Sequence, residues 1–78
     1  MNTNSEIEVI VNEQDAYDKT YHIKYKGYVI CEDASYDDEG CMFYSTTVYK
    51  DGKQIKHFNR EWIQKGIEYV DKLTGGKK

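Results

Sequence analysis

Apolar and polar residues alternate over several segments of the chain, and this pattern predicts β-strands. Ile7, Val9 and Val11 alternate with polar and apolar neighbours in the range 6–11, which predicts a first strand. The range 20–31 continues the alternation and ends in β-branched and aromatic residues, which predicts one long second strand. Gly27 inside it indicates a bulge or a close approach by another element.

Two further strands are predicted over 41–50 and 54–58, joined at the pair Asp51–Gly52. Asp-Gly between strand formers is typical of a tight hairpin, because glycine accepts the positive φ that such turns require. The polar range 12–19 predicts a loop, and the range 32–40 predicts an acidic connection between strands.

A helix is predicted after the last strand. Asn59 is placed as its N-cap, and Gly75 is a natural stop. Its apolar residues recur at spacings of three and four and form one stripe: Trp62, Ile63, Gly66, Ile67, Val70 and Leu73. The predicted fold is therefore α+β, an antiparallel sheet of three to four strands with one C-terminal helix packed on one face, in the order β-β-β-β-α.

With 78 residues, the chain has room for a single small domain over 1–78, and 1–5 and 75–78 are expected to be disordered tails. No window is apolar enough for a membrane span, and the N-terminus lacks the pattern of a signal peptide. These features predict a soluble, cytoplasmic protein.

If the chain folds back around the acidic connection, Cys31 faces Cys41 and the apolar residues divide between two faces of the sheet. The helix is expected to cover the face that contains Ile23 and Phe43, with Gly27 leaving room for Trp62. The other face collects aromatic and apolar side chains: Tyr28, Ile30, Met42, Tyr44 and Val48. A protein partner or a second copy of the chain is the expected cover; the N-terminal segment and a misread register are the alternatives.

Charge is distributed unevenly along the chain. Residues 1–40 hold ten acids against three lysines, a net charge of −7, whereas residues 41–78 hold four acids against eight bases, a net charge of +4. The acidic connection, with Asp37, Asp38 and Glu39, is a candidate docking site for a basic partner. The alternatives are a solvated loop and weak cation binding, although flanking strands and the lack of a central glycine do not fit a helix-loop-helix calcium site.

No nucleophile, base and acid can be assembled from the sequence, so we expect neither an enzyme nor a cofactor. Cys31 and Cys41 are expected to be reduced thiols, with a cross-strand disulfide as the alternative in an oxidising setting. Zinc binding by the two cysteines with His22 and His57 is not expected, because their spacing fits no zinc motif.

The sequence therefore predicts a small non-enzymatic interaction or regulatory module, for example an inhibitor, which binds a protein partner or itself. Nucleic-acid binding is the alternative, since a three-stranded sheet followed by a helix is similar in plan to the arm-binding domains of tyrosine integrases. The candidate contacts are sheet lysines: Lys24, Lys26, Lys50, Lys53 and Lys56. The net charge of −3 and the acidic connection oppose this alternative.

Overall fold

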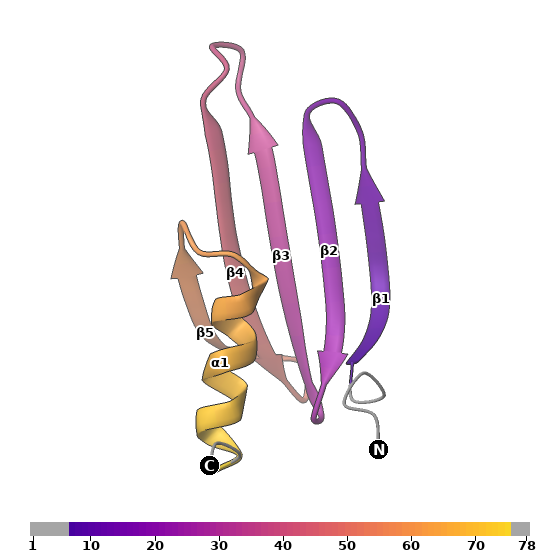
Figure 1. Ribbon diagram of the computed structural model, residues 1–78, viewed down its shortest axis with the longest axis vertical. Coiled ribbons are helices and arrows are strands. Elements are labelled where there is room, and N and C mark those ends of the chain that lie inside the picture. The colour runs from indigo at the N-terminus through magenta and orange to yellow at the C-terminus, as the bar shows by residue number, and fades with distance from the viewer. Residues whose placement is uncertain (1–6, 76–78) are drawn as a thin grey trace.

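The computed structural model describes residues 7–75, which form one antiparallel sheet with a helix on one face (Figure 1). The strands lie side by side in sequence order, β1-β2-β3-β4-β5. The elements are β1 (Ile7–Gln14), β2 (Asp18–Tyr25), β3 (Tyr28–Tyr36), β4 (Met42–Lys50), β5 (Lys53–Asn59) and α1 (Ile63–Leu73). The predicted α+β fold is confirmed, with five strands instead of three to four. α1 is the one helix among residues 7–75, and it is too short and too polar to cross a membrane.

The additional strand arises because the predicted strand 20–31 is a hairpin. Lys26 and Gly27 have φ values of 53° and 85°, so both central residues are left-handed, as in a type I′ turn. Asp51 and Gly52, with φ values of 54° and 81°, form the second turn of this kind, as predicted. Gly27 is therefore a turn residue, and the interpretation of this position as a bulge within a strand was wrong.

The turn at Lys26–Gly27 changes which side chains share a face. In the hairpin Ile23 pairs with Ile30, and Ile30 pairs in turn with Val48 of β4. All three side chains are fully buried beneath α1. The two apolar faces predicted from the sequence therefore belong largely to one core. The expectation of a second, uncovered face was wrong for Ile30 and Val48, which are buried.

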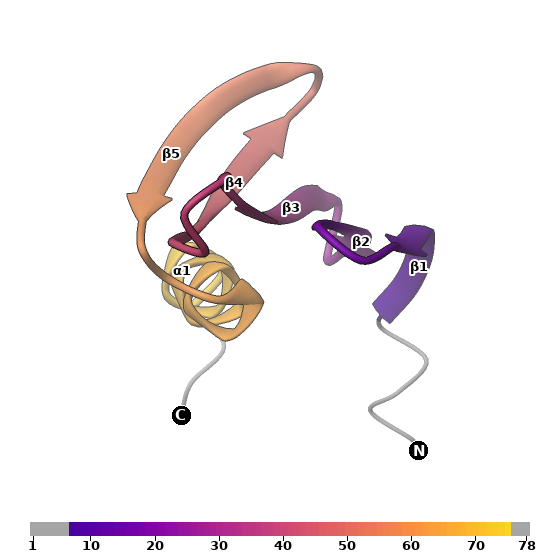
Figure 2. The ribbon, with the colours of Figure 1, turned by 90° about the horizontal axis from the view of Figure 1, so that it is seen from above.

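Gly66 allows α1 to approach the sheet closely. A Cβ atom at this position would lie 2.5 Å from Cγ2 of Ile30 and 2.9 Å from Cγ2 of Thr46. Val70, one turn further along α1, is fully buried in the same core. Figure 2 shows α1 beneath the β3–β4 part of the sheet, with β1 at the far edge. The room for the helix is thus provided by Gly66, whereas Gly27 was predicted to provide it.

The sheet supplies the cap of α1. The helix starts at Ile63, and no side chain of its own segment caps it. Instead, the backbone N–H of Ile63 donates to Oε2 of Glu32 in β3 at 2.7 Å, and Lys19 Nζ lies 3.0 Å from Oε1. Glu32 is 2% exposed, so this carboxylate is a buried link between two layers. Asn59, predicted as the N-cap, is the last residue of β5.

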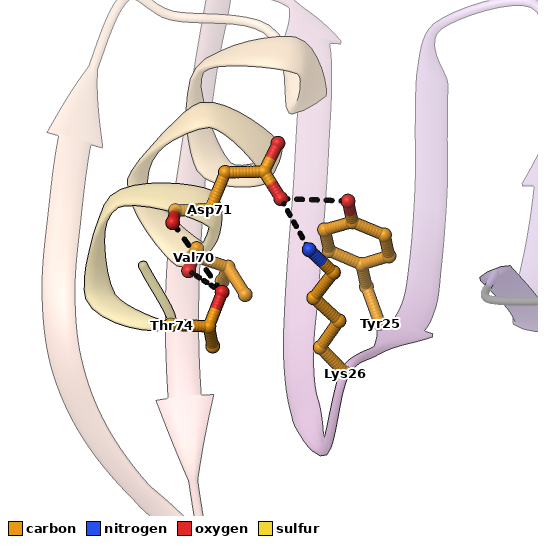
Figure 3. Close-up of polar contacts among 5 residues, drawn as sticks. All are labelled: Tyr25, Lys26, Val70, Asp71 and Thr74. Atoms are coloured by element: carbon orange, nitrogen blue, oxygen red, sulfur yellow. Dashed lines mark hydrogen bonds and ion pairs between the residues drawn. The ribbon is translucent and has the colours of Figure 1, made fainter. Parts of the chain in front are cut away.

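The C-terminal half of α1 is fixed to the β2–β3 turn. Asp71 Oδ1 accepts hydrogen bonds from the Tyr25 hydroxyl at 2.7 Å and from Lys26 Nζ at 3.0 Å (Figure 3). Thr74 Oγ1 donates to the carbonyl of Val70 at 3.0 Å. Gly75, with φ of 73°, ends the helix as predicted. Of the predicted tails 1–5 and 75–78, all residues except Gly75 lie outside the described residues.

Candidate functional site

The five side chains predicted to bind a partner do share one face of the sheet, but most of them belong to the core. Ile30 and Val48 have no exposed surface, and Tyr28 and Tyr44 are half-buried. Met42 remains 37% exposed. The predicted exposed patch is therefore reduced to its Met42 end, because α1 packs on the β3–β4 part of this face.

α1 covers only the lower part of its face of the sheet, and the β3–β4 hairpin extends well beyond the helix (Figure 1). Four large side chains line a hollow of about 240 Å³ in this uncovered region, which we call the aromatic hollow: Tyr17, Tyr36, Met42 and Trp62. They are between 37% and 67% exposed. Isolated apolar side chains on a surface are ordinary, whereas several around one hollow form a contiguous surface.

The backbone holds these side chains in place from four parts of the chain. Tyr36 and Met42 form the last pair of the β3–β4 ladder, and Tyr36 N–H donates to the carbonyl of Tyr17 at 2.9 Å. Trp62 directly precedes α1 and stacks on Tyr44, with ring centroids 4.2 Å apart and planes 9° from parallel. The hollow is therefore built on paired strands and a stacked ring, which are rigid supports.

Two carboxylates line the aromatic hollow. Asp15 and Asp18 line it, and Oδ1 of Asp15 accepts the backbone N–H groups of Tyr17 at 2.9 Å and Asp18 at 2.8 Å. These two hydrogen bonds lower the pKa of Asp15 from its ordinary value of 3.8 and thus further favour the charged carboxylate. Of the described residues that line the hollow, only Lys19 is basic, and its charge is balanced by the carboxylate of Glu32.

The acidic connection is shorter than predicted. Glu32 to Tyr36 continue β3, so the turn itself spans 37–41. Asp37 Oδ1 accepts the N–H groups of Glu39 and Cys41, both at 2.9 Å, and thus stabilises the turn. Asp38 and Glu39 are exposed and lie in the turn that joins Tyr36 to Met42; they do not line the aromatic hollow themselves.

The opposite face of the sheet carries a polar trough of about 460 Å³. Strand pairing places Asp33, Ser45 and Phe43 on this face, and Arg60, with a left-handed φ of 64°, lies at its edge. His57 is bonded here through Nδ1 to the Thr47 hydroxyl at 2.9 Å. The trough holds acidic and basic groups together, so its charge favours no single class of ligand.

The expectation that Cys31 and Cys41 lie opposite each other on neighbouring strands was wrong. Cys31 is opposite Thr47, whereas Cys41 is exposed in the turn, and both thiols are free. Burial raises the pKa of the Cys31 thiol, and the charge of Asp33 adds to this effect, which disfavours the thiolate that a cysteine nucleophile needs. Within residues 7–75, no three histidine, cysteine or acidic side chains are grouped as a metal site.

The candidate nucleic-acid lysines do not share one face. Lys24 pairs with Val29 on the open face, whereas Lys56 pairs with Val48 on the helix face. Lys26 is bonded to Asp71, and Lys50 Nζ lies 4.8 Å from the ring centroid of Tyr28. Within the described residues, the lysines therefore do not form one flat basic face that could enter a groove of DNA.

Sequence reasoning missed most of the aromatic hollow. Tyr17 was placed in a polar loop and Tyr36 in the acidic connection, while Trp62 was assigned to the buried stripe of the helix. A large aromatic residue within a polar connection was the available signal, since such connections usually consist of small and polar residues. No protein-family model, curated protein or solved structure matches the chain.

Proposed function

We propose that the protein is a small non-catalytic interaction module that binds a protein partner through the aromatic hollow. One observation carries the proposal: four large side chains from separate parts of the chain line one hollow and remain exposed. Exposed aromatic residues and methionine are enriched where proteins bind one another, and they supply most of the binding energy there. Regulation or inhibition of the partner is the activity expected of such a module.

The size of the hollow also favours a protein partner. Pockets for metabolites and drug-sized ligands measure roughly 300–1,000 Å³, and the aromatic hollow measures about 240 Å³. It therefore accommodates one or two side chains of a partner. A rim of carboxylates around an apolar centre matches the usual arrangement of a protein interface.

Strand alternation provides a closely matched experiment. Met42 and Phe43 are neighbours in β4, both exposed, but Met42 lines the aromatic hollow and Phe43 lines the polar trough. We expect Met42→Ser and Tyr36→Ser to lose a partner that the unmodified protein retains from extracts of its host, whereas Phe43→Ser keeps it. Equal retention by all three variants, or loss with Phe43→Ser alone, would contradict the proposal.

A further inference from the structure

We infer that the partner presents a basic segment, with a lysine or arginine side chain inserted into the aromatic hollow. This inference rests on the proposed function and adds the chemistry of the partner to it. It is carried by the combination of aromatic ring faces with unbalanced negative charge at one place on the surface.

The ring faces favour a cation. The face of an aromatic ring attracts an ammonium or guanidinium group within about 6 Å of its centroid, and tryptophan is the strongest of the three rings. The protein already uses this interaction, since Lys19 Nζ lies 5.9 Å from the ring centroid of Trp62 and 5.9 Å from that of Tyr21. The indole of Trp62 is already in contact with Tyr44 and Lys19, so a second cation from a partner would meet the exposed rings of Tyr17 and Tyr36.

The charge at this end of the molecule has the sign that such a partner needs. Lys19 is neutralised by Glu32, which leaves Asp15 and Asp18 at the wall of the hollow, and the exposed Asp38 and Glu39 lie in the turn between Tyr36 and Met42. An acidic segment would be repelled here, and a neutral one would gain nothing from the carboxylates. The apolar parts of the hollow, chiefly Met42, suit the aliphatic stem of a lysine or arginine.

Trp62 is the single tryptophan of the chain, so its fluorescence reports on the aromatic hollow alone. The purified protein is titrated with three synthetic peptides that share the same leucine positions and differ in carrying arginine, serine or glutamate between them. We expect the arginine peptide to change the Trp62 emission and to bind at least about tenfold more tightly than the other two at about 150 mM salt.

Matched variants separate the local charges from net charge. The triple variant Asp18→Asn, Asp38→Asn and Glu39→Gln removes three carboxylates around the hollow, and we expect it to weaken arginine-peptide binding by about tenfold. The control variant Glu8→Gln, Asp51→Asn and Glu68→Gln also removes three negative charges, outside the residues that line the hollow, and keeps the affinity within about twofold. Circular dichroism verifies that both variants are folded.

Three results would overturn the inference. Equal binding of the serine or glutamate peptide, lost in Tyr36→Ser, overturns the basic partner while supporting the hollow as an interaction site. If no peptide changes the Trp62 emission, the inference of a basic partner is overturned as well. The proposed function is then tested by the capture experiment with Met42→Ser, Tyr36→Ser and Phe43→Ser alone. A dimer that sediments as such and dissociates in Tyr36→Ser overturns it too, because a second copy is then the occupant.

Discussion

At the scale of single residues, the approach of α1 to the sheet depends on the missing side chain of Gly66. Alanine at this position would gain about 1 kcal/mol of helix propensity. The added methyl group would, however, lie 2.5 Å and 2.9 Å from the branched side chains of Ile30 and Thr46, which are buried and have no room to move away. Overpacking of this kind costs about 1–3 kcal/mol. Both contacts are shorter than 3.0 Å, so the cost lies toward the upper end of this range and outweighs the gain in helix propensity.

We therefore expect Gly66→Ala to lower the free energy of unfolding by about 1–2 kcal/mol, as measured by urea denaturation. Gln64→Ala, on the exposed side of the same helix, serves as the control and stays within about 0.5 kcal/mol of the unmodified protein. A Gly66→Ala variant as stable as that control would show that the helix tolerates a position further from the sheet.

Tyr25 and Lys26 are expected to make the stability of the fold decrease at alkaline pH. The hydrogen bond to Asp71 raises the pKa of the Tyr25 hydroxyl above its ordinary value of 10.0, and the same carboxylate raises the pKa of Lys26 above 10.5. In both cases the folded state favours the protonated form. Their contribution to stability is therefore complete below about pH 10 and is lost as the pH rises through the raised values.

The measurement is the melting temperature from about pH 9, where the contribution is complete, up to pH values above the ordinary 10.5 of lysine, where it is being lost. Tyr25→Phe removes one of the two protons concerned, so its melting temperature is expected to fall less over this window than that of the unmodified protein. In a spectroscopic titration, a tyrosine that ionises above the ordinary pKa of 10.0 is expected to be missing from Tyr25→Phe. Identical titration curves would contradict the role given to Asp71.

At the scale of elements, α1 depends on Glu32 of β3 for its first turn. An isolated helix of 11 residues is marginal in water, and its first backbone N–H groups need acceptors. Glu32→Gln keeps the shape of the side chain but removes its charge, which weakens both the bond to Ile63 and the pairing with Lys19. We expect a loss of roughly 2–3 kcal/mol in the free energy of unfolding.

Glu68→Gln removes a carboxylate from the exposed side of α1, so it controls for net charge and is expected to change stability by less than about 0.5 kcal/mol. Denaturant unfolding followed by circular dichroism compares the two variants. Similar stability of Glu32→Gln and Glu68→Gln would mean that the buried carboxylate adds nothing beyond its own desolvation.

The elements show which parts of the fold the sequence allows one to predict. Asp51–Gly52 was recognised because aspartate before glycine is common in left-handed turns, whereas Lys26–Gly27 was not, because lysine seldom adopts that conformation. A two-residue turn inverts the relation between sequence parity and face, and a continuous strand does not. Because this turn was not recognised, the sequence analysis placed Ile23 and Ile30 on opposite faces of the sheet, although they pair with each other in one core.

The candidate site was less predictable for the same reason. Met42, Asp38 and Glu39 were placed near a surface suited to partner binding, but Tyr17, Tyr36 and Trp62 are brought to it only by tertiary structure. Tyr17 reaches it through pairing of its carbonyl with the N–H of Tyr36. The cap from Glu32 was equally hidden, because it joins residues 31 positions apart.

At the scale of the whole molecule, the uneven charge of the sequence becomes a difference between two ends. The molecule measures 43 × 24 × 22 Å, and the turns β1–β2 and β3–β4 lie together at one end of its long axis (Figure 1). These turns carry acidic residues, including Asp15 and Asp38. At the other end, Lys26 lies in the β2–β3 turn, and Lys50 and Lys53 flank the β4–β5 turn, which itself holds Asp51. We expect a charged partner to be oriented by this difference before it makes contact.

The packing is uneven along the sheet as well. β1 is an edge strand whose residues are nearly all exposed, whereas β3 and β4 lie beneath α1. We expect the amide hydrogens of β1 to exchange with solvent well before those of β3 and β4, because opening this edge exposes little buried surface. Native-state hydrogen exchange measures this directly, and uniform protection across all five strands would contradict it.

The order of the strands also sets how fast the chain can fold. Each strand pairs with its neighbour in sequence, so every pairing closes a short loop and can begin as a hairpin, on a timescale of about 1–10 μs. We expect the helix to form after the sheet, since its first N–H group is bonded to Glu32 of β3. Stopped-flow kinetics is therefore expected to show slower folding in Gly52→Ala and faster unfolding in Glu32→Gln.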